Sequence, residues 1–112
     1  MNTRPLALLA TVLASAAALG GQIAASGAAS RTVTLKNIAF SPKSLSVSKG
    51  SKVTFAFRDD GTTHNVKSSG SKRFKSIGNR SAGSVARTFS RAGTYRYSCT
   101  LHPGMSGRIV VH

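Results

Sequence analysis

The residues of this sequence best suited to chemistry lie close together near its end. The only cysteine, Cys99, is followed by His102 and Met105 in the segment CTLHPGM. The Pro-Gly pair cannot continue a strand, so a loop of this length can fold back and bring a thiolate, an imidazole and a thioether to one centre. The alternative is that these residues are an inert buried cysteine, a solvated histidine and a core methionine.

The softness of these side chains indicates which metal they would bind. Thiolate and thioether ligands select copper over magnesium or calcium, and two histidines, one cysteine and a weak axial methionine are the ligands of a blue-copper electron-transfer site. Such a site needs a second histidine, and only His64 and His112 remain. His112 ends a strand that leads away from the loop, whereas His64 opens the segment HNVKS just after a turn. His64 is therefore the better candidate.

The first 29 residues are typical of a secretory signal peptide. Arg4 precedes an apolar run from Leu6 to Leu19, which is shorter than the ~20 residues that a membrane-spanning helix needs, and small residues follow up to Ala29. We expect a helical signal peptide at 1–29 and one domain at 30–112, exported to the periplasm, the cell surface or the medium. An uncleaved membrane-tethering helix is the alternative. Outside the cytoplasm, a single Cys99 is open to oxidation or to an intermolecular disulfide unless a metal protects it.

The rest of the sequence alternates in short runs typical of β-strands. Apolar residues recur at every second position in TVTL, SLSVS, KVTFAF and GTYRYSC, and turn-forming residues separate the runs. Seven or eight strands at this spacing predict an all-β, antiparallel Greek-key sandwich, with residues 68–83 as a loop around a short strand or turn near Phe74. In GTYRYSC the alternation places Tyr95, Tyr97 and Cys99 on the inner face. A thiolate buried there requires a nearby cation.

Over nearly the whole of residues 30–112 the sequence resembles a cupredoxin, a type 1 blue copper protein, of the plastocyanin and amicyanin group. The likeness runs through FSPKSLSVSKGSKVTFAF, HNV and GTYRYSCTLHPGMSGRIVV, and the CTLHPGM loop is most similar to that of amicyanin. The resemblance implies a cupredoxin-like sandwich that holds one copper ion. It implies His64 and His102 as ligands through Nδ1, with Cys99 as the thiolate and Met105 as a long axial ligand.

The resemblance also assigns roles to residues beside the ligands. Asn65 is expected to tie the two ligand loops together by a hydrogen bond to the backbone or hydroxyl of Thr100, although a simple turn-forming role is the alternative. Pro103 is expected to stiffen the loop. Leu101 stands where amicyanin-like loops have a proline, and its N–H could donate to the Cys99 sulfur.

A hydrogen bond from Leu101 to the thiolate would favour Cu(I) over Cu(II). We therefore expect a higher reduction potential for the natural chain than for Leu101→Pro. Voltammetry of the two proteins tests this expectation, and an equal or higher potential in the variant would contradict it.

The charge of the chain limits its partners. Sixteen Lys and Arg residues stand against two Asp and Glu residues, for a net charge of +14. A surface of this kind attracts anions. The basic residues are scattered rather than gathered into one run, and export disfavours nucleic acid. We expect a monomer with an acidic redox protein as its partner, and an anionic cell-wall polymer or lipid surface as alternatives.

These features together predict a one-electron carrier rather than an enzyme. The resemblance implies that partners dock at the exposed edge of the loop, on Leu101, His102, Pro103 and Gly104. A copper-binding or delivery protein with the same ligands is the alternative function. A hydrolase is disfavoured because Asp59 and Asp60 are adjacent and would point to opposite faces of a strand. A multicopper oxidase would need more histidines than the three present.

Overall fold

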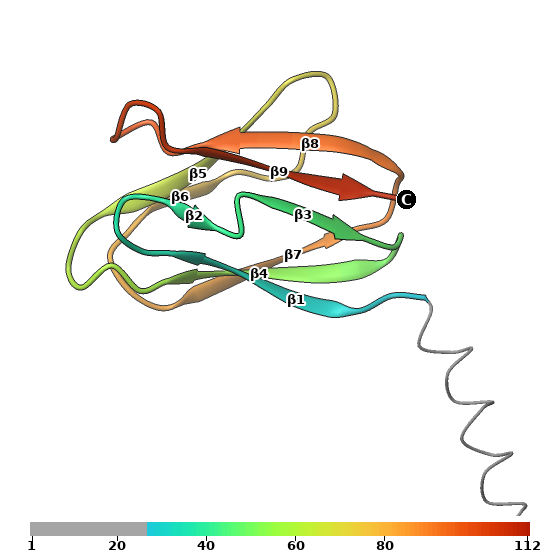
Figure 1. Ribbon diagram of the computed structural model, residues 1–112, viewed down its shortest axis with the longest axis horizontal. Coiled ribbons are helices and arrows are strands. Elements are labelled where there is room, and N and C mark those ends of the chain that lie inside the picture. The colour runs from blue at the N-terminus through green and yellow to red at the C-terminus, as the bar shows by residue number, and fades with distance from the viewer. Residues whose placement is uncertain (1–26) are drawn as a thin grey trace, which may run out of the picture.

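The computed structural model describes residues 27–112, and these fold into a β-sandwich (Figure 1). The expected signal peptide at 1–29 lies outside the described residues except for its last three. None of the described residues belongs to a helix long and apolar enough to cross a membrane. The described part of the chain has nine strands: β1 (Ser30–Leu35), β2 (Phe40–Ser41), β3 (Ser44–Val47), β4 (Ser51–Phe57), β5 (His64–Ser69), β6 (Ile77–Arg80), β7 (Ser84–Phe89), β8 (Gly93–Ser98) and β9 (Ser106–Val111).

The strands form two sheets, with the orders β2-β1-β4-β7 and β3-β9-β8-β5-β6. The predicted all-β sandwich is confirmed, but its strands are not all antiparallel. β1 runs parallel to β4, and β3 runs parallel to β9. The alternation of apolar residues specifies which face of a strand is buried and is silent on the direction of its neighbour. The chain crosses from one sheet to the other between β2 and β3, and this crossover allows both parallel pairs.

The core lies between the sheets and is rich in aromatic residues. Tyr97 meets Phe40 and Phe55 edge to face, with ring centroids 4.8 and 5.4 Å apart. Phe74 packs on Phe55 and on Phe89. Edge-to-face pairs add to the free energy that burial alone provides, so these rings join the two sheets firmly.

Residues 68–83 are more regular than expected. The short strand in this region is β6, which pairs with β5, and it lies after Phe74 rather than at it. The Ser68 hydroxyl accepts from the Phe74 N–H at 3.0 Å, and the Ser76 hydroxyl accepts from the Ser68 N–H at 2.9 Å. These side-chain bonds hold the loop in place. The presence of serines in a loop does not predict such bonds from the sequence.

The strand order brings the chemically important residues to one end of the sandwich. β5 begins at His64, β8 ends one residue before Cys99, and β9 begins one residue after Met105. Because β5 and β8 are antiparallel neighbours, the start of one lies beside the end of the other. The loop between β8 and β9 is at the end of the molecule opposite the chain's C-terminus (Figure 1).

Candidate metal centre

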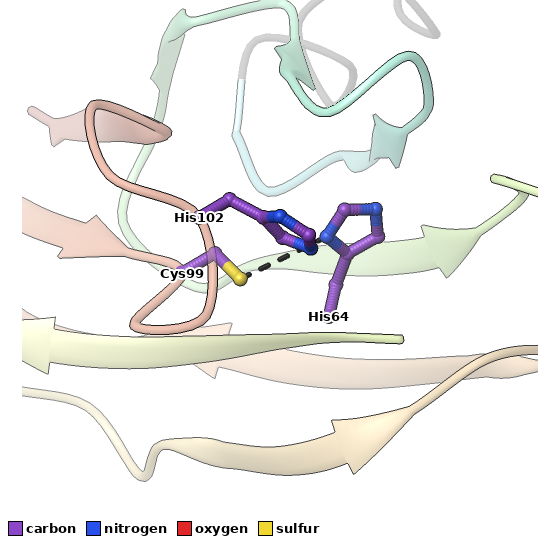
Figure 2. A group of neighbouring side chains, drawn as sticks. All are labelled: His64, Cys99 and His102. Atoms are coloured by element: carbon purple, nitrogen blue, oxygen red, sulfur yellow. Dashed lines mark hydrogen bonds between the residues drawn. The ribbon is translucent and has the colours of Figure 1, made fainter. Parts of the chain in front are cut away.

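Two histidines and the cysteine meet at this end of the sandwich (Figure 2). One possible ligand atom from each of His64, Cys99 and His102 lies within 4.8 Å of the other two. The Cys99 Sγ is 3.7 Å from His64 Nδ1, and the two imidazole centroids are 4.7 Å apart. His64 and Cys99 are buried, at 0% and 3% exposure, and His102 is half-buried. The site therefore joins residues 35 positions apart in the chain.

The loop that carries Cys99 is closed by its own backbone. The Cys99 N–H donates to the Met105 carbonyl at 2.9 Å, and the Met105 N–H donates to the His102 carbonyl at 3.1 Å. The second bond closes a β-turn with Pro103 and Gly104 in the middle. Gly104 has φ +84°, as position i+2 of a type II turn requires, and proline suits position i+1. The turn thus places His102 and Met105 at its two ends.

Met105 is buried at 4% exposure and packs in the hydrophobic core. Its place directly after the turn puts its side chain at the base of the loop that carries His102. A thioether is uncharged, so its burial costs little. The expected axial ligand is thus held inside the protein, at the end of the sandwich where the other three residues meet.

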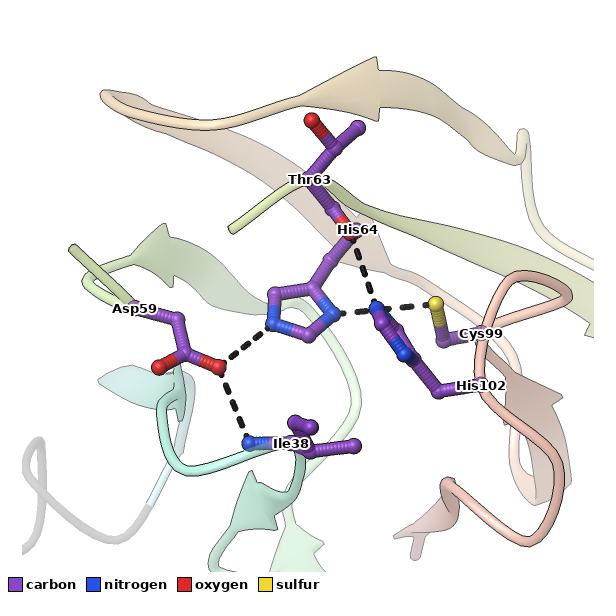
Figure 3. A network of polar contacts seen from close by, with 6 residues as sticks. All are labelled: Ile38, Asp59, Thr63, His64, Cys99 and His102. Atoms are coloured by element: carbon purple, nitrogen blue, oxygen red, sulfur yellow. Dashed lines mark hydrogen bonds and ion pairs between the residues drawn. The ribbon is translucent and has the colours of Figure 1, made fainter. Parts of the chain in front are cut away.

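Each imidazole has one nitrogen tied to an oxygen (Figure 3). His64 Nε2 lies 2.7 Å from Asp59 Oδ2, and His102 Nε2 lies 3.1 Å from the Thr63 carbonyl. A carboxylate and a carbonyl oxygen can only accept, so Nε2 carries the hydrogen in both rings. In both rings Nδ1 is then the nitrogen with the free lone pair, which is the atom that the resemblance implies as ligand.

The Asp59 carboxylate is held ionised by its hydrogen bonds. The Ile38 N–H donates to Oδ2 at 2.9 Å, and His64 donates to the same oxygen. The Ile38 N–H, and after it His64, lower the pKa of Asp59 below its ordinary value. A negative charge therefore faces the outer edge of the His64 ring.

The predicted hydrogen bond between Asn65 and Thr100 is confirmed. Asn65 Nδ2 donates to the Thr100 hydroxyl at 2.8 Å, and the Thr100 N–H donates to Asn65 Oδ1 at 2.9 Å. Asn65 Nδ2 also donates to Asn79 Oδ1 at 2.9 Å. One amide side chain thereby links β5, β6 and the loop after β8.

Leu101 lies differently from the expectation. Within the described residues no hydrogen bond joins its N–H to the Cys99 sulfur, and its side chain is 43% exposed. The backbone bonds that close the loop join Cys99 to Met105 and Met105 to His102, and Leu101 takes no part in them. The structure therefore gives no support to the expected effect of Leu101→Pro on the reduction potential.

Four neighbours of the site were missing from the sequence prediction: Ile38, Asp59, Thr63 and Asn79. Ile38 and Thr63 act through their backbone, which the sequence does not distinguish. Asp59 carried one available signal, since it is one of only two acidic residues in a strongly basic chain. His112 was correctly set aside, because its backbone pairs with Val47 at the far end of β9.

The donor set fits a copper ion. As a thiolate, Cys99 would place a negative charge among buried groups, and a bound cation would compensate it. Sulfur and imidazole donors together suit copper, whereas magnesium or calcium would require oxygen ligands, and the cluster found among the described residues includes no carboxylate. The arrangement is compatible with a one-electron metal centre.

Comparison with known proteins agrees with this geometry. The family model for the cupredoxin-like domain matches residues 6–111. A search of curated proteins finds no match. Among solved structures, a purple cupredoxin from Nitrosopumilus maritimus is 21% identical, with a TM-score of 0.64, over 73% of this chain and 99% of that one.

Two amicyanin structures are closer in sequence. An oxidised methionine-to-leucine variant of amicyanin is 28% identical, with a TM-score of 0.66, over 72% of this chain and 80% of that one. A reduced tryptophan-to-tyrosine variant is 29% identical, with a TM-score of 0.65 and the same coverage. The match of the family model over most of the chain, with this fold and this cluster of donors, supports one copper ion as the cofactor. The chain belongs to the cupredoxin family, in the group of amicyanin and plastocyanin.

Proposed function

We propose that this chain is an exported blue copper protein that carries single electrons between redox partners and is not an enzyme. The observation that supports this most strongly is the meeting of His64, Cys99 and His102, with Nε2 of both rings bonded to an oxygen and Nδ1 of His64 facing the Cys99 sulfur. These three residues would hold copper, together with the Met105 thioether.

The protein surrounding these residues is suited to a site that changes little on electron transfer. Bound copper would supply the Cu(II)/Cu(I) couple. The turn from His102 to Met105 fixes the backbone of the loop, the Asn65–Thr100 pair ties that loop to β5, and the Asp59–His64 contact holds one imidazole. Ligands fixed in this way need not rearrange when the charge on the site changes, and this favours rapid transfer.

The visible spectrum of the purified protein with Cu(II) tests the proposal. We expect one equivalent of copper and an intense blue thiolate-to-copper band, lost in Cys99→Ala and in His64→Ala. His112→Ala is the matched control and should keep the band, because His112 lies at the other end of the sandwich. A colourless protein that binds copper and yields Cu(I) to a chelator within seconds would instead indicate copper delivery.

The proposed docking surface for redox partners is the exposed edge of the loop, Leu101, His102, Pro103 and Gly104. Ile38 extends it, because Ile38 and Leu101 are the large hydrophobic side chains most exposed among the described residues, at 52% and 43%. Ile38 lies close to the histidine pair (Figure 3), and Leu101 directly precedes His102 in the chain. A small apolar surface on a protein with a net charge of +14 would fit an acidic redox protein better than a cell-wall polymer or a lipid surface. We propose that the chain acts as a monomer.

Export is proposed from the N-terminal sequence. β1 begins at Ser30, and the backbone of Ala29 already bonds to Ser51 and Lys52. Removal of residues 1–29 would leave every strand intact. Mass spectrometry of the protein isolated from outside the cytoplasm tests this, and a full-length mass in that fraction would contradict it.

A further inference from the structure

The Asp59 carboxylate contacts the proposed copper ligand His64, and the proposed function does not yet assign it a role. The chain has two acidic residues, and the carboxylate of one of them lies 2.7 Å from the Nε2 atom of a fully buried histidine. Its neighbour Asp60 is exposed and makes no such contact. In a protein with a net charge of +14, a carboxylate could pair with many Lys and Arg side chains. The Asp59 carboxylate instead contacts the proposed ligand His64.

The carboxylate is itself held by a strained turn. Lys36 and Ala39 exchange two backbone hydrogen bonds, of 3.0 and 3.1 Å, around Asn37 and Ile38. These two residues have φ of +54° and +53°, as a type I′ hairpin turn requires. A β-branched residue is seldom found in this left-handed region. The strained Ile38 uses its N–H to donate to Asp59 Oδ2, the oxygen that also receives His64 Nε2 (Figure 3).

The approach of the chain to Asp59 is fixed as well. The Arg58 N–H donates to the Leu35 carbonyl at 3.0 Å, and the Thr62 N–H donates to the Asp59 carbonyl at 2.8 Å. The backbone is therefore anchored on both sides of Asp59. This anchoring holds the Asp59 carboxylate against the His64 ring.

We propose that Asp59, held by the backbone N–H of Ile38, is a positioning residue that fixes the tautomer and orientation of His64 and sets the charge behind that copper ligand. The inference rests on the proposed function. A carboxylate hydrogen-bonded to a ligating imidazole keeps Nε2 protonated, leaves Nδ1 as the metal-binding atom and makes the ring a stronger donor. Its negative charge also favours Cu(II) over Cu(I), so it lowers the reduction potential.

Two substitutions separate the hydrogen bond from the charge. Asp59→Asn is nearly isosteric and keeps an oxygen that can accept from both donors, but it removes the charge. Asp59→Ala removes both. Asp60→Asn removes an equal charge one residue away and is the matched control. Thermal unfolding of each variant shows whether it is folded.

We expect Asp59→Asn to raise the reduction potential clearly more than Asp60→Asn does. We expect Asp59→Ala to weaken Cu(II) binding by roughly 10- to 100-fold, as for the loss of other groups that orient metal ligands, while Asp60→Asn binds as the natural chain does. The ¹⁵N resonances of His64 should report hydrogen on Nε2 in the natural chain, and a mixture of tautomers in Asp59→Ala. These spectra are recorded in both the copper-free and the Cu(I) forms.

Equal potentials in Asp59→Asn and Asp60→Asn, or an unchanged His64 tautomer in a folded Asp59→Ala variant, would overturn the inference. The proposed function is decided separately by the blue band of the natural chain. If that band is missing, the proposed function fails, and the tautomer of His64 in the copper-free protein still decides whether Asp59 positions the ring.

Discussion

At the scale of single residues, the close fit of Tyr97 over Gly107 shows how tightly the core supports the site. The two residues are directly opposite on β8 and β9, and a Cβ atom added to Gly107 would lie 2.7 Å from the Tyr97 hydroxyl. That hydroxyl has no hydrogen-bond partner in the part of the chain that the structure describes, and burial raises the pKa of Tyr97. The uncharged ring of Tyr97, two residues before Cys99, therefore lies directly on Gly107.

This contact predicts the effect of one methyl group. Gly107→Ala should lower the free energy of unfolding by about 1–3 kcal/mol, because the Tyr97 hydroxyl and two carbons of its ring, which is enclosed by other aromatic rings, would have to move. Gly78→Ala is the matched control on β6, where nothing lies within 4 Å of the added atom. Chemical denaturation of the two variants measures the difference, and equal stability would contradict the prediction.

At the scale of elements, the turns at the copper end of the sandwich decide where the side chains lie. Pro103 and Gly104 suit the type II turn that they form, whereas Ile38 does not suit the type I′ turn between β1 and β2. The hairpin therefore retains strain that a glycine would relieve, and the N–H that it presents to Asp59 does not depend on the side chain.

Ile38→Gly is accordingly expected to raise the free energy of unfolding, by about 1 kcal/mol, because glycine adopts the left-handed conformation without steric cost. The N–H donor remains, so the blue band and the reduction potential should stay as in the natural chain. Denaturation curves and voltammetry of the variant measure both. Loss of stability in Ile38→Gly would mean that the exposed side chain contributes more than the turn conformation costs.

At the scale of the whole molecule, charge is the dominant feature. Arg96 and Arg108 are directly opposite on β8 and β9, on the outer face of the sheet, and with Lys43 they line one shallow hollow. Like charges in this position destabilise a sheet. Arg108 donates to the Ser44 hydroxyl at 3.1 Å, and no acidic residue lines the hollow. The pair of arginines therefore lowers the stability of the isolated protein, and its positive charge would attract an anionic partner.

Replacing Arg96 and Arg108 by Gln should therefore have opposite effects on two measurements. The association rate with an acidic redox partner should fall severalfold at low salt and become less sensitive to salt, because the steering field is weaker. The free energy of unfolding should rise by a few tenths of a kcal/mol as repulsion is relieved. Arg31→Gln combined with Lys49→Gln removes the same two charges and is the control, since both residues lie near His112 at the other end of the sandwich. An equal loss of rate in that control would show that only total charge matters.

Much of the fold and the site followed from local pattern. The alternation of GTYRYSC placed Tyr95, Tyr97 and Cys99 inward, and the structure confirms this, because burial of one face imposes a period of two on any strand. The strand directions did not follow, since a parallel and an antiparallel neighbour require the same alternation. Nor did the outward path of Leu101, which depends on the backbone bonds that close the loop.

The sequence by itself determined the chemical identity of the site, because Cys99, His102 and Met105 lie within one short loop and a soft metal selects their donor atoms. Only the tertiary structure decided which groups accept the hydrogen bonds from Nε2 of the two histidines. Asp59 and Thr63 meet them through loop conformation and through backbone atoms that every residue shares. The Thr63–His102 contact joins residues 39 positions apart, and the Asp59 carboxylate is held by the N–H of Ile38, 21 positions away, so residue type and spacing do not reveal these bonds.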